Sequence, residues 1–179
     1  MRRKIKNSLY GISKELNKVA SYFLYLASIS NKPITNKKLQ KLVYYAQAWS
    51  LVLNNKRLFP DKIEAWIHGP AIRGLYFTFN KFGFKPIEMN LNEDVENELA
   101  KEDKELIEEV WRVYGKCDAE YLEFLTHSEL PWQKAREGLD LAEPSSNEID
   151  LDIMKEYYTK RLEEVKQKRK ERERELVNQ

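Results

Sequence analysis

The sequence has few of the residues that build metal centres, disulfides and membrane anchors. Its 179 residues include one cysteine, Cys117, and two histidines, His68 and His127. A single cysteine excludes an internal disulfide, and so few thiol and imidazole groups argue against a zinc site. No run of about 18 uncharged apolar residues is present to form a membrane-spanning helix. These absences predict a soluble, cytoplasmic protein that holds no metal.

Sequence motifs of common catalytic sites are absent as well. The chain has no P-loop motif, no GxSxG nucleophile elbow and no HExxH zinc motif. Cys117 precedes Asp118, whose negative charge disfavours a thiolate nucleophile. We therefore predict that the protein is not an enzyme and uses no cofactor. The alternative is a hydrolase or transferase of small molecules, which would require a deep pocket that holds both histidines and several carboxylates.

The charged residues are segregated along the chain, although the net charge is only +2. Residues 1–18 carry six basic side chains and one acidic one, whereas residues 93–109 carry nine acidic and two basic side chains. Residues 155–175 are basic again, with nine positive and six negative side chains. An acidic middle repels nucleic acid and attracts basic partners, so nucleic-acid binding is disfavoured. The two basic segments keep it as an alternative.

Apolar residues recur at helical spacing through most of the chain. Residues 19–28 are mostly apolar, and Thr35 is a favourable N-cap for the helix that follows. Shorter patterns of the same kind predict helices at residues 98–114, 118–125 and 131–138. One face of the helix after Thr35 is formed by Leu39, Leu42, Val43, Ala46, Trp49 and Leu53. We therefore expect a mainly α fold, organised as a single compact helical domain.

One short stretch near the middle of the chain differs from these helices. Apolar and more polar residues alternate over residues 63–67, which predicts a short strand. Residues 86–91 are its expected partner, so that the helical domain would contain a small two-stranded β piece. Gly69-Pro70 is expected to begin the next helix, because proline is favoured at the first helical position.

The C-terminal part is expected to form one extended charged helix. Ser145, followed three residues later by Glu148, is a capping box and predicts that the helix begins there. Residues 166–175 contain no apolar side chain, so they cannot bury a helical face. We therefore divide the chain into a helical domain, residues 1–165, and a charged C-terminal helical tail, residues 166–179.

Three sequence blocks in a fixed order carry a family resemblance. They run from Ile34 to Leu53, from Ile63 to Phe79, and from Leu125 to Arg136. Their diagnostic residues include Lys38, Leu39, Lys41, Leu42 and Tyr45, then Trp66, Gly69 and Pro70, and finally His127, Glu129, Pro131 and Trp132. Together the blocks resemble the Panacea antitoxin domain, a SocA-like family that is also described as phage-associated.

The resemblance implies the antitoxin of a toxin–antitoxin system. Such a protein neutralises a cognate protein toxin by direct protein–protein contact, with no catalytic turnover and no cofactor. One alternative that the resemblance also implies is a proteolytic adaptor, which presents the toxin to a cytosolic protease. A nucleic-acid-binding autoregulator is the other alternative, and no membrane partner is expected.

Several motif residues have ordinary structural explanations. Trp49 lies on the apolar face of its helix and Trp132 lies in a first helical turn, so both are expected to be packing anchors. His127 lies between two helices, where an imidazole commonly bonds unpaired backbone groups. Lys38 and Lys41 lie away from the apolar face, and we interpret them as solvated, with a nucleic-acid patch as the alternative.

The expected partner-binding surface consists of Trp66, His68, Gly69, Pro70 and Arg73. An exposed tryptophan is a favoured interface anchor. A helix that begins at Gly69-Pro70 would present backbone N–H groups and Arg73 to a carboxylate or phosphate of the toxin. The competing interpretation is that Gly69 and Pro70 only form a bend and a helix start.

Overall fold

The structure is a computed structural model that describes residues 11–89 and 94–177. The fold is mainly α, as predicted, and within these residues no helix is both long and apolar enough to cross a bilayer. The basic residues Arg2, Arg3, Lys4 and Lys6 lie outside the described ranges. The elements are α1 (Lys14–Ile29), α2 (Asn36–Leu53), β1 (Glu64–Trp66), β2 (Gly69–Ala71), α3 (Arg73–Phe79), η1 (Asn80–Phe82), η2 (Val95–Asn97), α4 (Lys101–Tyr114), α5 (Ala119–His127), α6 (Leu130–Ala135) and α7 (Leu151–Val177).

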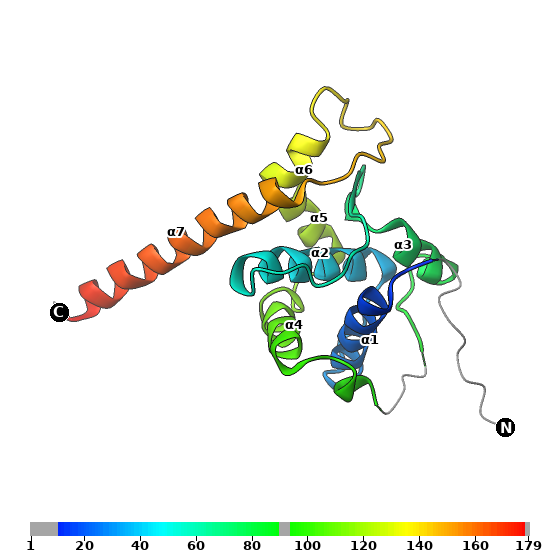
Figure 1. The fold of residues 1–179 in the computed structure, drawn as a ribbon, viewed down its shortest axis with the longest axis horizontal. Coiled ribbons are helices and arrows are strands. Elements are labelled where there is room, and N and C mark those ends of the chain that lie inside the picture. Colours follow the sequence, from blue (N-terminus) through cyan, green and yellow to red (C-terminus); the bar gives the residue numbers. More distant parts are fainter. Residues whose placement is uncertain (1–10, 90–93, 178–179) are drawn as a thin grey trace.

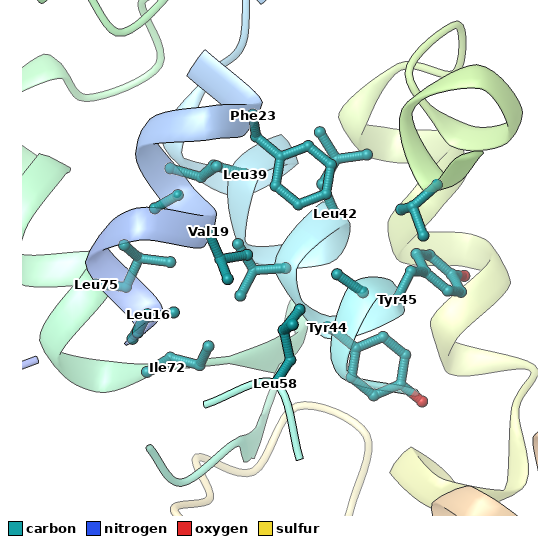
Figure 2. Close-up of a cluster of buried hydrophobic side chains, with 14 of the residues drawn as sticks. Leu16, Val19, Phe23, Leu39, Leu42, Tyr44, Tyr45, Leu58, Ile72 and Leu75 are labelled. Atoms are coloured by element: carbon teal, nitrogen blue, oxygen red, sulfur yellow. The ribbon is translucent and has the colours of Figure 1, made fainter. Parts of the chain in front are cut away.

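Helix α2 is the centre of the fold (Figure 1). Helices α1, α3, α4, α5 and α7 and strand β2 all contact it. As predicted, the Thr35 side chain caps α2 by accepting a hydrogen bond from the Lys38 backbone N–H at 3.2 Å. Leu39 and Leu42 are fully buried, and Figure 2 shows them beside Val19 of α1. The apolar face of α2 therefore packs into the hydrophobic core.

Because α2 is covered on nearly all sides, its polar side chains are buried too. The Gln47 side-chain amide donates to Phe59 O at 3.0 Å, and its oxygen accepts from Leu58 N at 2.7 Å. Gln40 Oε1 accepts from Ile72 N at 2.8 Å. A buried polar group that lost its partner would cost about 1–3 kcal/mol, so these bonds hold the covering loops against α2.

The interpretation of Lys38 and Lys41 as solvated is wrong. Only 8% and 2% of their surface is exposed. Lys38 Nζ donates to Gly115 O at 2.7 Å, and Lys41 Nζ donates to Pro70 O at 3.0 Å. Helical spacing identified the apolar face of α2, but it could not show that the α4–α5 junction and the β1–β2 hairpin cover another face. The two lysines therefore do not form a solvated basic patch on the surface of α2.

The predicted strand is present, but its partner differs from expectation. β1 pairs in antiparallel register with β2, with Ala65 opposite Pro70 and Trp66 opposite Gly69. Gly69 and Pro70 therefore lie in a strand, and the following helix begins at Arg73. β2 is an edge strand, and an edge strand tolerates a proline without an N–H. The expectation that Gly69-Pro70 forms a helix start is thus wrong.

The segment expected to pair with β1 lies elsewhere. Pro86 forms an isolated bridge with Thr35, and Ile87 N donates to Ile34 O at 2.8 Å. Residues 86 and 87 therefore lie against the chain that leads into α2, and residues 90 and 91 lie outside the described ranges.

Helix α7 begins later than the capping box predicted. Asp150 Oδ1 accepts from the backbone N–H groups of Asp152 and Ile153, at 2.7 and 3.1 Å. Residues 147–149 instead run beside β1, where Asn147 O accepts from the Ala65 N–H at 2.8 Å. Pairing with the hairpin keeps this segment extended, so the N-cap moves to Asp150.

Helix α7 has a packed part and an exposed part. Met154 and Tyr158 are buried, and α7 contacts α2 and α6. Every side chain from Glu163 to Leu176 is exposed, and this part extends away from the rest of the protein (Figure 1). Ion pairs such as Arg169–Glu173, at 3.0 Å, stabilise such a helix by only about 0.2–0.5 kcal/mol each. The division into residues 1–165 and 166–179 falls inside the exposed part and stays a prediction.

Truncation after Val165 should leave the stability of the remaining protein nearly unchanged. The removed side chains that the structure describes are exposed and bury no apolar surface, so the free energy of unfolding should change by less than about 0.5 kcal/mol. Thermal denaturation followed by circular dichroism measures this. A marked drop in melting temperature would mean that the tail packs on the core.

Candidate functional site

The three sequence blocks meet at one buried point beneath the hairpin. Lys41 comes from α2, Gly69 from the hairpin and Thr126 from α5. A Cβ atom added at Gly69 would lie 2.8 Å from Thr126 Oγ1 and 2.9 Å from Lys41 Nζ. Gly69 also has a backbone φ angle of +89°, which residues other than glycine rarely adopt. Only glycine therefore allows the hairpin to lie this close to α2 and α5.

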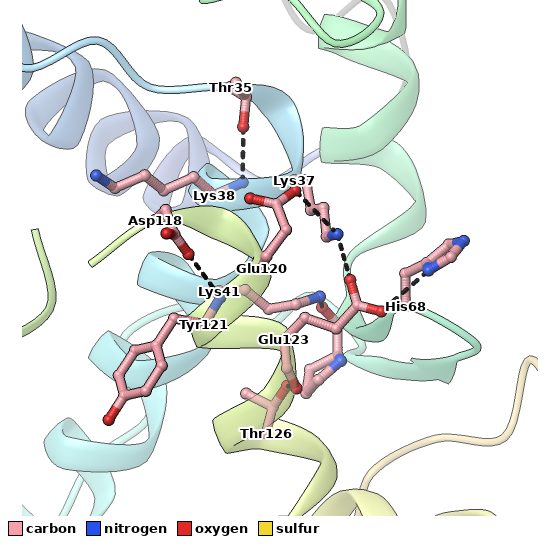
Figure 3. Close-up of polar contacts among 11 residues, drawn as sticks. Thr35, Lys37, Lys38, Lys41, His68, Asp118, Glu120, Tyr121, Glu123 and Thr126 are labelled. Carbon is pink, nitrogen blue, oxygen red and sulfur yellow. Dashed lines mark hydrogen bonds and ion pairs between the residues drawn. The ribbon is translucent and has the colours of Figure 1, made fainter. Parts of the chain in front are cut away.

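Glu123 of α5 contacts two basic side chains at this site, Lys37 and His68. Its Oε2 pairs with Lys37 Nζ, and its Oε1 lies 3.1 Å from His68 Nδ1 on the hairpin loop. Figure 3 shows the carboxylate between these two side chains, with Lys41 beside it. Burial alone would raise the pKa of Glu123, but the bonds from Lys37 and His68 outweigh burial and hold the pKa below its usual range. Glu123 is thus a paired anion.

Lys41, in contrast, has no ion-pair partner among the described residues. Burial lowers the pKa of its ammonium to about 7, and this outweighs the attraction of Glu123. The pKa of His127 is also lowered, first by burial, and a hydrogen bond to the Ile67 backbone opposes that shift. The His127 ring stacks on Trp132, with the ring centroids 4.1 Å apart. As expected, this imidazole bonds a backbone group, although that group belongs to the hairpin loop.

A groove of about 430 Å³ opens beside Lys41, between α2, the hairpin and the end of α3. Its wall includes Trp66, Tyr76 and Phe84, and Phe84 is 98% exposed. The small-molecule enzyme alternative required both histidines and several carboxylates in one pocket. Among the described residues that line the groove, His68 is present, whereas His127 and all carboxylates are absent. The groove does not support that alternative.

The expected partner-binding residues lie together on and around the hairpin. Arg73 donates to both oxygens of Glu64, at 3.1 and 2.8 Å, and Trp66 Nε1 donates to the same carboxylate at 2.7 Å. The Arg73 guanidinium lies 5.5 Å from the Trp66 ring centroid. His68 is exposed, whereas Gly69 and Pro70 are buried and support the hairpin from within. Trp66, His68 and Arg73 are therefore the members that a partner can reach.

Trp132 and Arg136 hold the hairpin from the side of α6. Trp132 is 3% exposed, and its Nε1 donates to Trp66 O at 2.9 Å. Arg136 donates to Ala65 O at 3.0 Å and to Glu143 O at 2.6 Å. Pro131, in the first turn of α6, is buried as well. As expected, Trp132 is a packing anchor, and α6 fixes the strand that carries Trp66.

Glu129 ties α2, α6 and α7 together through tyrosine hydroxyls. Tyr158 donates to Glu129 Oε2 at 2.6 Å, and Tyr45 donates to Oε1 at 3.2 Å. Tyr45 stacks on Tyr114, with the ring centroids 4.0 Å apart, and Trp49 Nε1 donates to the Tyr114 hydroxyl at 3.2 Å. Burial raises the pKa of Glu129 to about 7, although the tyrosine hydrogen bonds oppose the shift. This hydrogen-bond network links α2, the start of α6 and α7.

Sequence reasoning missed Glu123, Tyr158 and the two buried lysines as parts of these networks. Glu123 resembles any solvated helical acid in the sequence, and no local signal identifies it. Lys41 carries a weak signal, because it lies one turn before Tyr44 and Tyr45. Among the described residues no group of three or more possible metal ligands is found.

A family model described as "Antitoxin SocA-like, Panacea domain" matches residues 39–133. The chain belongs to this family. The matched part of this Panacea domain begins in α2, ends in α6, and includes the hairpin and Trp132, whereas Arg136 lies outside it. Helix α1 and α7 lie outside the match. No curated protein and no solved structure matches the chain.

Substitution of Gly69 by alanine should destabilise this Panacea domain more than the same change at Gly138. Both glycines have nearly equal φ values, +89° and +85°, but the space around a Cβ at Gly138 is open. The backbone strain is therefore matched, and Gly69→Ala should cost about 1–3 kcal/mol more because of overpacking. Urea denaturation of both variants measures the difference. Equal losses would show that α2 and α5 move aside freely.

The Glu129→Gln variant should change how stability depends on pH. The folded pKa of Glu129, about 7, lies above its usual value of 4.5, so its contribution to stability is complete below pH 4.5. That contribution is lost as the pH rises through 7, by roughly 3 kcal/mol at most. Denaturation curves from pH 4 to 8 should show a flatter dependence in Glu129→Gln than in the wild type or in the exposed control Glu137→Gln. Parallel curves for all three would refute a buried, protonated Glu129.

Proposed function

We propose that the protein is the antitoxin of a toxin–antitoxin system and neutralises its cognate toxin by direct protein–protein binding in the cytoplasm. The observation that carries this proposal is the family match, since it covers the second block and most of the first and third, which converge on the hairpin. The proposal needs no catalytic residue, metal or cofactor. Binding alone can neutralise a toxin, provided that the complex covers the surface the toxin uses.

We further propose that the toxin contacts Trp66, His68 and Arg73, with Gly69 and Pro70 as the support beneath them. Trp66 and Arg73 are of the residue types that dominate interface energetics. Their side chains are already oriented by Glu64, so binding would require little ordering of them. Tyr76 lies edge-to-face with Trp66, with ring centroids 5.1 Å apart, and enlarges the aromatic part of this surface.

The exposed part of α7 favours one variation of this function. A helix without a buried face is accessible to a protease or to a second protein, which suits an adaptor that presents the toxin for degradation. In cells, toxin levels should then fall when the antitoxin is present, and truncation after Val165 should restore them. Stable toxin levels during rescue would favour neutralisation by binding alone.

Co-expression with the product of the adjacent reading frame tests the main proposal. A toxic neighbour should lose its effect on growth in the presence of this chain, and the two proteins should co-purify. Rescue without a complex, together with chemical modification of the toxin or reversal of its product, would contradict direct binding. Salt-dependent retention of the isolated protein on DNA would favour the autoregulator instead.

An Arg73→Glu variant should weaken toxin binding at least tenfold while the melting temperature stays close to that of the wild type. The substitution reverses an exposed charge and places two carboxylates beside Trp66. Arg112→Glu is the matched control, because Arg112 is also exposed and also pairs with a glutamate, on the distant helix α4. Calorimetry with purified toxin measures both variants. Equal effects at the two positions would remove Arg73 from the partner surface.

A further inference from the structure

Lys41 is a buried cation whose hydrogen-bonding capacity is only partly used. An ammonium group has three N–H donors, and among the described residues Lys41 Nζ has one acceptor, Pro70 O at 3.0 Å. No described carboxylate lies within ion-pair distance of it. Lys38, the other buried lysine of α2, lies over the Trp111 ring and does not line the groove. Lys41 does line the groove, so its remaining donors can meet a ligand there.

The other charges around Lys41 are already paired or exposed. Glu123 pairs with Lys37 and with His68, and this leaves Lys41 as the described cation of the site without a counter-ion. Burial drives its pKa down to about 7, because the attraction of Glu123 offsets only part of the loss of solvation. One negative charge would complete the site. A phosphate group with two charges fits less well, because the Glu123 carboxylate lies beside Lys41 (Figure 3).

The wall of the groove combines aromatic side chains with polar ones such as Lys37 and Asn80. Trp66, Tyr76 and Phe84 are the aromatic members, and Phe84 is exposed to the solvent over nearly its whole surface. The volume of about 430 Å³ is within the range of small-ligand sites. A ligand that carries one carboxylate and one apolar side chain on neighbouring atoms would use both features. A polypeptide C-terminus that ends in an aromatic or aliphatic residue has this arrangement.

We propose that the groove between α2 and the hairpin binds the C-terminal carboxylate of the toxin, with Lys41 as the counter-ion and the aromatic residues around the terminal side chain. The proposal rests on the proposed function for the identity of the partner, but not for the chemistry of the site. Capture of a chain end by a cation and backbone groups is an established mode of peptide recognition. The terminal residue would lie beside Trp66, so this site and the Trp66–Arg73 surface are continuous.

Titration of the full chain with N-acetylphenylalanine tests the site without the toxin. This probe has one carboxylate and one aromatic side chain, and its amide, N-acetylphenylalaninamide, is the uncharged control. In NMR spectra of protein labelled at lysine Cε, the Lys41 signal should shift saturably with the acid but not with the amide. The Lys41 signal is identified by its loss in Lys41→Met.

The affinity for the acid should fall about tenfold between pH 6 and pH 8, since the protonated fraction of Lys41 falls about tenfold across a pKa near 7. Other groups that face Lys41 are Lys37 on α2, Glu123 and His127 on α5, and His68 on the hairpin. Any pH dependence that remains in Lys41→Met belongs to them.

Three variants separate the site from the fold. Lys41→Met should abolish binding of the acid, whereas Lys38→Met, a buried lysine of the same helix, should retain it. Phe84→Ala should weaken binding several-fold and leave the melting temperature unchanged, because Phe84 is exposed. Phe84→Ala thus remains informative even if Lys41→Met folds poorly.

Several outcomes would overturn the proposal. They are the absence of a saturable shift, equal binding of acid and amide, tighter binding of inorganic phosphate or ADP, and tighter binding of a blocked glutamate whose only carboxylate is in the side chain. The outcome for the proposed function is independent. If toxin binds wild type and Lys41→Met equally, the carboxylate site is wrong and the antitoxin function stands. If N-acetylphenylalanine binds but no toxin complex forms, the groove binds a carboxylate and the proposed antitoxin function is wrong.

Discussion

The burial of helix α2 on nearly all sides is the constraint on which the rest of the structure depends. A helix placed there must enclose its polar side chains, and each of them needs a partner from the segment that covers it. Each of these side chains donates a hydrogen bond to a backbone carbonyl: Lys38 to that of Gly115, Lys41 to that of Pro70, and Gln47 to that of Phe59. The loops of this protein are therefore held in place chiefly by side chains of one helix.

The hairpin shows how this constraint positions a surface. Lys41 bonds it from below, and Gly69 allows the close approach. Trp132 and Arg136 bond the carbonyls of Trp66 and Ala65 from the side of α6. With its backbone held from two directions, the hairpin presents its outward side chains in one arrangement. A rigid surface of this kind loses little conformational entropy on binding a partner.

Helix α7 joins the core through the same helix but by different chemistry. Tyr158 of α7 and Tyr45 of α2 both donate hydrogen bonds to Glu129. A buried carboxyl group and tyrosine hydroxyls therefore connect these helices, with no ion pair among them. The stability of this network depends on pH through Glu129, whereas the described side chains of the exposed part of α7 bury no apolar surface. One continuous helix thus contains a segment that packs against the core and a segment whose described side chains are all exposed.

Much of the fold could be predicted from local sequence. Hydrophobic spacing and the N-caps Thr35 and Asp118 determine the helices, since both depend on neighbouring residues alone. The exposed C-terminal helix follows from its lack of apolar residues, and the three blocks identified the family. The residues expected at the partner surface are neighbours in the structure, on the hairpin and at the start of α3, and their contact with a toxin stays a prediction.

Tertiary structure decided what local sequence could not. Lys41 is buried because the hairpin, distant from α2 in the sequence, covers it, and Pro70 lies in a strand of that hairpin. The start of α7 moved to Asp150 because residues 147–149 pair with the hairpin. The charge state of a side chain likewise depends on which distant group faces it. Local spacing determines which segments are helical, and only the packing of those segments determines which polar groups lose water and need a partner.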